Sequence, residues 1–424
     1  MSGLFDDLGW RGLVHQMTDP DALTKLLDQD SLVAYIGFDP TADSLHLGHL
    51  LQVCPLRRLQ HAGHRPIALV GGGTGMIGDP TGRSDERSLL TPEELDANRA
   101  AIREQLERFI DFGTSGAILE DNITWLGPAR LLEFLRQVGK QFTVNEMVRK
   151  ESVRSRLEGR EQGISYTEFS YMLLQAWDFL ELFDRHGCRL QMGGSDQWGN
   201  ITEGVDLIRR SREAQAFGLT SPLVTKADGT KFGKTEAGAV WLDARRTSPY
   251  QLFQYLVRTA DSEVGTYLRY FTFLDRGTIE ALDRSVASRP ERREAQRTLA
   301  REVTSLVHGP AEAARAERAA DVLFTEEIVH LDEATLAGGL ADAPTTTIGP
   351  DDLDGRLSLV DALVRTGLVA SRGEARRQLQ GGGVYVNNRK QAEDRPLTTG
   401  DAIHGRFVVL RRGRAAQHAL VVGG

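Results

Sequence analysis

Residues 32–49 read LVAYIGFDPTADSLHLGH, and this stretch decides the fold that we expect. An apolar run ends at Asp39, Pro40 interrupts it, and a polar turn leads into a helical pattern. From here to about Thr225, short apolar runs alternate with spans long enough for crossover helices, which predicts an α/β domain with a parallel sheet. The expected strands are Leu32–Phe38, Pro66–Val70, Ala117–Leu119, Arg189–Met192 and Leu223–Val224.

Capping residues indicate where the helices start. Thr91 and Glu94 have the spacing of a capping box, and Pro92 lies between them at the first helical position. Ser165 and Glu168 repeat the spacing. After the first strand, Asp43 or Ser44 is expected to cap the next helix.

The composition changes along the second half of the chain. From Ser248 to about Phe324 the strand signal disappears and helical periodicity takes over. Residues 326–354 hold eight Asp and Glu and neither Lys nor Arg, a composition typical of a solvated linker. The expected division is an α/β domain at 1–240, a small helical domain at 241–325, an acidic linker at 326–355 and a basic module at 356–424.

Charge is distributed unevenly over the 424 residues. Residues 356–424 hold 12 Lys and Arg against 5 Asp and Glu, a balance of +7, which leaves −15 for residues 1–355 because the net charge is −8. A basic tail on an acidic body suggests that the tail meets a polyanion. A charged module that merely keeps the chain soluble is the alternative.

The residue types also limit the class of protein. Cys54 and Cys188 are the two cysteines, too few for a disulfide framework, so we expect a reducing compartment, the cytoplasm. Two cysteines and ten histidines leave little for a structural zinc site, and no metal ligands are predicted. No apolar run approaches the ~18 residues of a membrane-spanning helix. The acidic start lacks a basic segment before an apolar one, so no secretory signal is expected.

His46 and His49 form the first candidate site. Three residues apart on the first turn of the expected helix, they share one face, beside free N–H groups and the positive end of the helix dipole. Gly48 leaves room for a ligand against the backbone. The alternatives are two exposed cap histidines, or zinc shared with His61 and His64. A single helix from 46 to 61 would hold the two pairs about 22 Å apart, which excludes a shared metal.

A glycine-rich loop follows the second strand. Gly73, Gly75 and Gly78 satisfy G-x-G-x-x-G, but Pro80 and Gly82 interrupt the helix that a dinucleotide fold needs there. We expect these glycines to let the backbone approach a small ligand. Three polar residues accompany the loop: Asp79 is free to meet a cation, and Arg83 and Arg87 are either phosphate contacts or solvated surface arginines.

A polar stripe runs along the helix that begins near Ser165. Tyr171, Gln175 and Asp178 stand at i, i+4 and i+7 among apolar neighbours, so they share one face of a largely buried helix. Buried polar groups need partners, and the stripe therefore either satisfies the fold internally or lines a pocket for a polar molecule. Asp196 ends the next strand, where ligands bind in open α/β sheets, and could accept ribose hydroxyls or serve as a plain helix cap.

Lys231 and Lys234 lie on a glycine-containing loop after the last expected strand. A loop that moves can bring two positive charges to a phosphate leaving group. Taken alone, K-x-x-K is usually a solvated turn.

Together these segments resemble the class I aminoacyl-tRNA synthetases, most closely their tyrosine-specific bacterial branch. The two class signatures appear as His46-Leu-Gly-His49 and Lys231-Phe-Gly-Lys234-Thr235, and blocks at 35–50, 70–80, 191–200 and 225–235 match in order. The tail resembles an S4 RNA-binding domain around 371–377 and 383–387. The resemblance implies a Rossmann-like catalytic domain, a helical anticodon-side domain and an S4-like domain.

The resemblance also implies roles for matching positions. The reactants would be L-tyrosine, ATP and tRNA(Tyr), with Mg²⁺ accompanying ATP. The chain would form a homodimer. Tyrosine would be held by Tyr35, Asp79, Tyr171, Gln175, Asp178, Gln191 and Gln197. ATP would meet Gly37, Asp39, His46, Gly48, His49, Gly194, Asp196, Lys231 and Lys234. Catalysis would use Thr41, His46, His49, Arg83, Arg87, Lys231, Lys234 and Thr235, and RNA would meet Arg372, Arg376 and Arg377. Ile36, Gln52 and Arg83 depart from the usual pattern around ATP.

Three other functions deserve comparison. A tryptophan-specific synthetase would share the fold but has no phenol to bind, which the pair Tyr35 and Asp178 argues against. An inactive scaffold that only binds RNA would not need the signature residues, which are His46, His49, Lys231 and Lys234. A nucleotidyltransferase of cofactor synthesis shares an H-x-G-H motif but lacks the helical domain and the basic tail.

Overall fold

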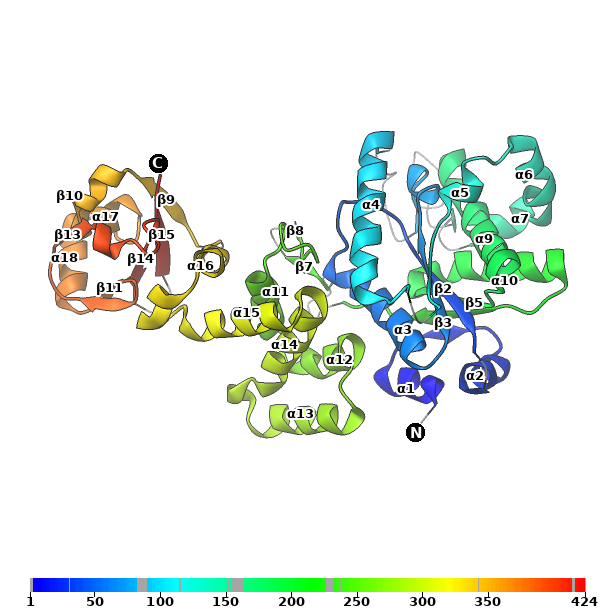
Figure 1. Ribbon diagram of the computed structural model, residues 1–424, viewed down its shortest axis with the longest axis horizontal. Coiled ribbons are helices and arrows are strands. Elements are labelled where there is room, and N and C mark those ends of the chain that lie inside the picture. Colours follow the sequence, from blue (N-terminus) through cyan, green and yellow to red (C-terminus); the bar gives the residue numbers. More distant parts are fainter. Residues whose placement is uncertain are drawn as a thin grey trace. The chain divides into compact units, whose positions relative to one another are not determined.

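The computed structural model describes residues 3–29, 31–81, 90–113, 116–150, 153–154, 157, 164–225, 232–235, 238–341, 343–413 and 416–423 (Figure 1). Contacts divide the chain into two compact units. The first comprises 1–246 and 259–299, and the second comprises 247–258 and 300–424.

A six-stranded sheet forms the centre of the first unit, in the order β1-β6-β5-β2-β3-β4. The neighbours from β6 to β4 are parallel, and β1 pairs antiparallel with β6 at the edge. This confirms the predicted α/β class with a parallel sheet. The strands are β1 (Gln16–Met17), β2 (Val33–Phe38), β3 (Arg65–Val70), β4 (Ile118–Asp121), β5 (Leu190–Gly194) and β6 (Phe217–Ser221).

Helices cover both faces of this sheet, with α3 and α4 on one side and α9 and α10 on the other (Figure 1). Thr91 and Ser165 cap α4 and α9 as predicted, each accepting a hydrogen bond from the N–H three residues on. The helices of the unit are α1 (Leu4–Arg11), α2 (Pro20–Gln29), α3 (Leu50–His61), α4 (Pro92–Phe109), α5 (Ile123–Leu126), α6 (Leu131–Gln137), α7 (Val144–Met147), α9 (Tyr166–His186), α10 (Trp198–Arg212), α12 (Asp261–Phe271) and α13 (Arg276–Ser288).

The predicted strand Leu223–Val224 is wrong. The strand is β6, and the side chain of Leu223 is about half exposed. The glycine and hydroxyl residues of β6 hide it from an apolar pattern. Gly218 is required there because a Cβ would overlap the side chain of Ile201 on α10.

The second unit has its own sheet, in the order β12-β11-β14-β15-β9, with β9 parallel to β15 and the other pairs antiparallel. Apolar residues of α17 and α18 pack with those of this sheet in a separate core. The chain passes between the units on either side of 247–258 and again within α14 (Glu294–His308). The other elements are α11 (Pro249–Val257), α15 (Pro310–Val322), α16 (Glu333–Leu340), β9 (Thr345–Ile348), β10 (Asp354–Ser358), α17 (Leu359–Arg365), α18 (Arg372–Gln380), β11 (Val384–Val386), β12 (Arg389–Gln391), β13 (Pro396–Thr398), β14 (Phe407–Arg412) and β15 (Ala416–Val422).

Two of the expected segments differ from the structure. The helices of 241–325 do not form one domain, because α12 packs on α1 and α3 whereas α11 packs on α15 and α16. The expected linker 326–355 contains α16 and β9, and the pairing of Thr345–Ile348 with β15 completes the sheet. The acidic composition of this segment suggested a linker. Composition could not indicate β9, because β9 is stabilised by its pairing with β15, far away in the sequence.

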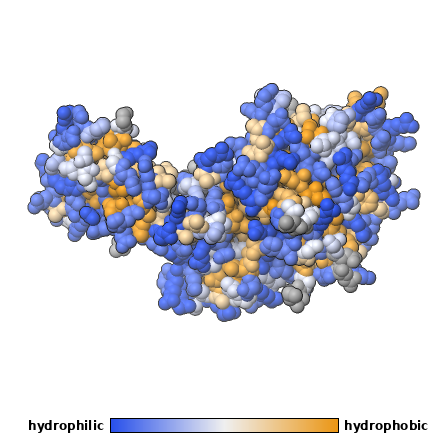
Figure 2. Space-filling model, in the orientation of Figure 1, coloured by the Kyte–Doolittle hydropathy of each residue, from blue (hydrophilic) through white to orange (hydrophobic). Residues whose placement is uncertain are grey.

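Charged and polar residues cover most of the face that Figure 2 shows, and apolar residues reach it in patches between them. In the part of the chain that the structure describes, no helix is both long enough and apolar enough to cross a membrane.

Candidate active site

A cavity of about 450 Å³ opens in the first unit, where β2, β3 and β5 end. Carboxyl ends of parallel strands are where ligands bind in open α/β sheets. The structure brings together here most of the described residues that the sequence predicts. The predicted residues that line it are Tyr35, Gly37, Asp39, Thr41, His46, Gly48, His49, Asp79, Tyr171, Gln175, Asp178, Gln191, Gly194, Asp196, Gln197 and Lys234.

The buried end of the cavity presents a phenol and a carboxyl group. Tyr35 on β2 is 1% exposed, and its hydroxyl has no hydrogen-bond partner among the described residues. Asp178 on α9 is buried too, and it accepts hydrogen bonds from Asn122 Nδ2 at 2.9 Å and Trp125 Nε1 at 2.7 Å. Burial raises the pKa of Asp178 to about 8, against the effect of those two donors. The carboxyl group is thus fixed in direction and costly to ionise.

Within the described part of the chain, Gln191 on β5 adds a second buried polar atom without a hydrogen-bond partner at the same end of the cavity. Its side-chain carbonyl oxygen is buried and has no partner within the described ranges. Buried polar atoms are usually paired, so unpaired ones that line a cavity indicate a ligand with polar groups of its own.

A chain of polar side chains follows the cavity wall from β3 to α10. Gln197 Nε2 donates to Asp79 Oδ2 at 2.7 Å, and Asn200 Nδ2 donates to Gln197 Oε1 at 3.2 Å and to Gln175 Oε1 at 3.0 Å. Asp79 is nearly buried, and the backbone N–H of Thr81 donates to its other oxygen at 2.9 Å. This arrangement aims a fixed carboxylate at the cavity, where a cation would meet it.

Asp39 lies where β2 ends and collects donors from two other elements. Tyr171 on α9 donates to its Oδ2 at 3.0 Å, and Thr74 donates to its Oδ1 at 2.8 Å. Gly71 permits this approach, since a Cβ there would overlap Asp39. The glycine-rich loop thus lets the backbone approach a carboxylate of the protein itself, whereas we expected it to let the backbone approach a ligand.

Sequence reasoning missed four residues of this network: Thr74, Asn122, Trp125 and Asn200. Two of them had a positional signal. Asn122 follows β4 directly, at the edge where ligands bind, and Asn200 stands three residues after Gln197, in the first turn of α10.

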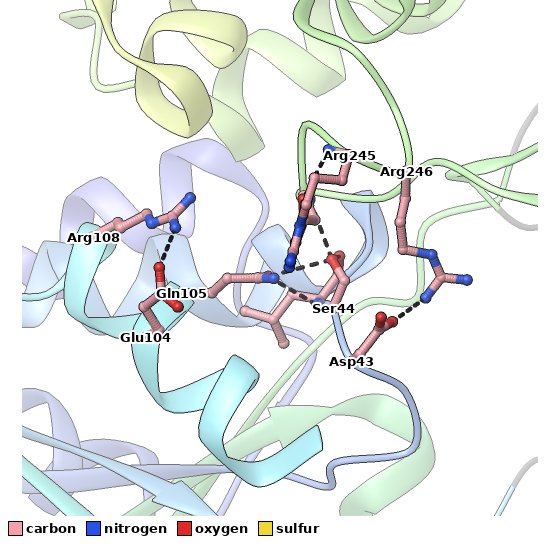
Figure 3. A network of polar contacts seen from close by, with 9 residues as sticks. Asp43, Ser44, Glu104, Gln105, Arg108, Arg245 and Arg246 are labelled. Atoms are coloured by element: carbon pink, nitrogen blue, oxygen red, sulfur yellow. Dashed lines mark hydrogen bonds and ion pairs between the residues drawn. The ribbon is translucent and has the colours of Figure 1, made fainter. Parts of the chain in front are cut away.

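The histidine segment differs from its predicted form. The helix α3 begins at Leu50, later than the predicted cap at Asp43 or Ser44 would start it, and residues 47–49 form one 3-10 turn. His46 is extended because it pairs across an isolated bridge with Trp241. Neither predicted cap is used. The side chain of Asp43 pairs with Arg246, and the hydroxyl of Ser44 donates to Leu45 O (Figure 3).

The two imidazoles nevertheless meet, as their spacing predicted. Their rings stack with centroids 3.8 Å apart, and His49 Nδ1 accepts the backbone N–H of His46 at 3.0 Å. Burial lowers the pKa of both, and Lys234 lowers that of His46 further. Both are therefore neutral at pH 7, and His49 carries its proton on Nε2, because Nδ1 accepts.

Lys234 is held in a hairpin. It belongs to β7 (Lys234–Thr235), which pairs with β8 (Gly238–Ala239), and its side chain is exposed. The preceding Phe232 is buried, and its ring stacks on that of Phe271 with centroids 5.0 Å apart. The backbone of Lys234 is thus paired in a hairpin, whereas we predicted that it would lie on a mobile loop. Lys231, Arg83 and Arg87 lie outside the described residues.

Another part of the cavity lining is the turn after β5. Gly194 ends the strand, and a Cβ there would lie 2.6 Å from Asp196 Oδ1. Asp196 is exposed within a 3-10 turn that precedes α10. Gly37 and Thr41 also line the cavity.

The predicted RNA-binding arginines lie in the second unit, on α18. Arg372, Arg376 and Arg377 are all exposed there, as their spacing predicted. Arg372 also pairs with Asp361 of α17 at 2.5 Å.

Comparison with known proteins agrees with this geometry. Residues 27–325 match the family of tRNA synthetases class I (W and Y), and residues 335–420 match the tyrosine–tRNA ligase SYY-like C-terminal domain. The tyrosine–tRNA ligase of Roseiflexus castenholzii is 53% identical over 99% of both chains, and that of Geobacillus stearothermophilus is 52% identical over 97% of both. A C-terminally truncated mitochondrial tyrosyl-tRNA synthetase of Aspergillus nidulans superposes with a TM-score of 0.69 at 32% identity, over 76% of this chain and 94% of that one.

The chain therefore belongs to the class I tRNA synthetases of the tryptophan and tyrosine type, a family of ligases. Identity above one half across the full length places it, within that family, among the bacterial tyrosine–tRNA ligases.

Proposed function

We propose that the chain activates L-tyrosine with ATP to tyrosyl-adenylate and pyrophosphate, and then transfers tyrosine to the 3′-terminal adenosine of tRNA(Tyr). The observation that carries the choice of amino acid is the buried, unpaired hydroxyl of Tyr35 beside the oriented carboxyl group of Asp178. A substrate phenol O–H satisfies both, since it donates to Asp178 and accepts from Tyr35.

The α-ammonium group of tyrosine has a matching site further along the cavity. Asp79 supplies the negative charge, and its orientation is fixed by Gln197 and the N–H of Thr81. Tyr171 and Gln175 of α9 add hydroxyl and amide oxygens on the same side. With the phenol held at one end and the ammonium at the other, the carboxylate of tyrosine is directed toward the histidine segment.

Activation is then a displacement at the α-phosphorus. A carboxylate oxygen of tyrosine forms a bond to that phosphorus, and the bond to the bridging oxygen breaks as pyrophosphate leaves. Neutral His46 donates an N–H to the departing phosphates, with Thr41 and Lys234 beside it. These positioned donors stabilise charge that develops in the transition state. Lys231, Thr235, Arg83 and Arg87 belong to the same proposal on sequence grounds.

His49, Gly194 and Asp196 are the proposed ribose contacts, with Gly37, Gly48 and Asp39 nearby. Among the described residues, no three His, Cys, Asp or Glu side chains converge to hold a metal ion. In this proposal Mg²⁺ arrives on the phosphates of ATP as part of the substrate.

In the second step, a hydroxyl of the terminal ribose of tRNA attacks the adenylate carbonyl, and AMP leaves. The basic module supports this partner, because the exposed arginines of α18 attract phosphates. We place the reaction in the cytoplasm, on the same cysteine usage that the sequence shows.

A second copy of the chain is the further proposed partner. Leu131 and Leu132 on α6 are 69% and 79% exposed, and Val144 on α7 is 62% exposed. Large apolar side chains gathered on neighbouring short helices favour burial against another chain.

Charging of tRNA(Tyr) with labelled tyrosine, tryptophan or phenylalanine tests the proposal. We expect tyrosine to be attached and the other two to be rejected by about 10⁴–10⁵, a range taken from a tyrosyl-tRNA synthetase itself. Efficient attachment of tryptophan would overturn the assignment of the phenol site.

A further inference from the structure

The segment 240–246, here called the strap, joins the two signature segments of the active site through its backbone. On one side, Leu47 donates its N–H to Val240 O at 2.8 Å, and Leu242 donates to Leu45 O at 2.8 Å. On the other side, Val240 donates to Gly233 O at 2.8 Å, in the hairpin of Lys234. His46 and Lys234 are therefore held to each other by one short stretch of chain.

Side chains fasten the strap to the histidine segment at its far end (Figure 3). Arg246 pairs with Asp43 Oδ1 at 2.5 Å, and its guanidinium carbon lies 3.5 Å from the centre of the Trp241 ring. The Trp241 ring in turn lies 6.2 Å from the His46 ring. A continuous row of contacts thus runs from the Asp43 carboxylate through the guanidinium and the indole to the imidazole.

A second anchor holds the segment from α4. Gln105 Oε1 accepts the N–H of Leu45 at 2.9 Å, and Ser44 Oγ accepts the N–H of Asp243 at 3.2 Å. Leu45 is thereby fixed between α4 and the strap. The ring of His46, one residue later, stacks on that of His49 with centroids 3.8 Å apart and also lies against the ring of Trp241.

We propose that Arg246 and Trp241 are positioning residues, which hold the His46 imidazole in register with Lys234 for adenylate formation. The proposal rests on the role given above to His46. Its physical basis is that small displacements of a positioned group cost much of its effect on a transition state. Neither residue lines the cavity, so both act through His46 rather than on the substrate.

The neighbouring Arg245 provides a matched control. It also pairs with a carboxylate at 2.5 Å, that of Asp243, but its side chain is 80% exposed and turns to the other side of the strap (Figure 3). The variants Arg246→Ala and Arg245→Ala thus remove the same chemistry from adjacent positions. Only the first removes the stack on Trp241.

Tyrosine-dependent ATP–pyrophosphate exchange by the full-length chain tests the proposal. Arg246→Ala should lower kcat about tenfold and leave the KM for tyrosine within about twofold, whereas Arg245→Ala should leave both within about twofold. Arg246→Lys keeps the charge beside Asp43 and part of the stack, so it should recover to within about threefold of the parent. Equal effects of the two alanine variants would overturn the proposal.

A double-mutant cycle separates positioning from a general loss of structure. In a His46→Ala background, Arg246→Ala should cost less than about twofold, because the group that it positions is gone. A full tenfold loss in that background would contradict the proposal. If Arg246→Ala lowers the unfolding midpoint strongly, Asp43→Asn makes the same test with a smaller change. A parent chain that shows no tyrosine-dependent exchange would instead refute the proposed function.

Discussion

Replacing Tyr35 with Phe separates the needs of the ligand from those of the fold. The Tyr35 hydroxyl is buried, and it has no partner in the described chain. Its ring packs against Phe179 with centroids 5.3 Å apart, a contact that Phe keeps. A buried polar group without a partner costs about 1–3 kcal/mol, so Tyr35→Phe should raise the free energy of unfolding by about 1 kcal/mol.

The same change should weaken recognition of tyrosine. The substrate phenol loses one neutral hydrogen bond of about 0.5–1.5 kcal/mol, while phenylalanine loses nothing. Discrimination between the two, measured as the ratio of kcat/KM in pyrophosphate exchange, should therefore fall by about two- to tenfold. Chemical denaturation measures the stability of the same variant.

Tyr166→Phe is the control, because Tyr166 lies on the same helix as Asp178 but is 75% exposed. This variant should change neither the free energy of unfolding nor the discrimination between tyrosine and phenylalanine. Unchanged discrimination in Tyr35→Phe would refute the assignment of the phenol site. A loss of stability in the same variant would show that the fold itself uses the Tyr35 hydroxyl.

Three further predictions follow from the described residues. The pKa of Asp178 is raised to about 8, so the folded chain binds one proton more than the unfolded chain between about pH 4 and 8, and stability should fall as pH rises through that window. Asp178→Asn should flatten that fall in denaturation curves at several pH values, and an unchanged slope would show that another group is responsible. Gly218→Ala should cost about 1–3 kcal/mol of stability, because its Cβ would overlap Ile201, and a neutral result would mean that β6 can shift. Replacing Arg372, Arg376 and Arg377 by Ala should weaken tRNA binding and reduce its salt slope by up to about three, while pyrophosphate exchange stays intact. Equal salt slopes would remove α18 from RNA recognition.

Local sequence pattern was enough to predict one wall of the cavity. Tyr171, Gln175 and Asp178 follow from helical spacing alone, and they face the cavity. The donors that orient Asp178 could not be predicted in this way. Asn122 and Trp125 come from the end of β4 and from α5, more than fifty residues earlier, and only the sheet brings them beside α9.

The histidine segment shows the opposite case, in which non-local pairing overrides a local signal. Asp43 and Ser44 are good caps by residue type, yet the strap pairs with residues 45–47 and delays the helix to Leu50. The predicted linker fails for the same reason, because β9 depends on β15, some seventy residues further on. Arg83, Arg87 and Lys231 remain predictions from the sequence.

The central claim is that the cavity selects tyrosine by its phenol and joins it to AMP. The most direct test is ATP–pyrophosphate exchange by the full-length chain, measured with each of the twenty amino acids in turn. We predict exchange with tyrosine, and at least about 10⁴-fold lower kcat/KM for phenylalanine and tryptophan. Exchange that prefers tryptophan, or that proceeds equally well with phenylalanine, would contradict this claim.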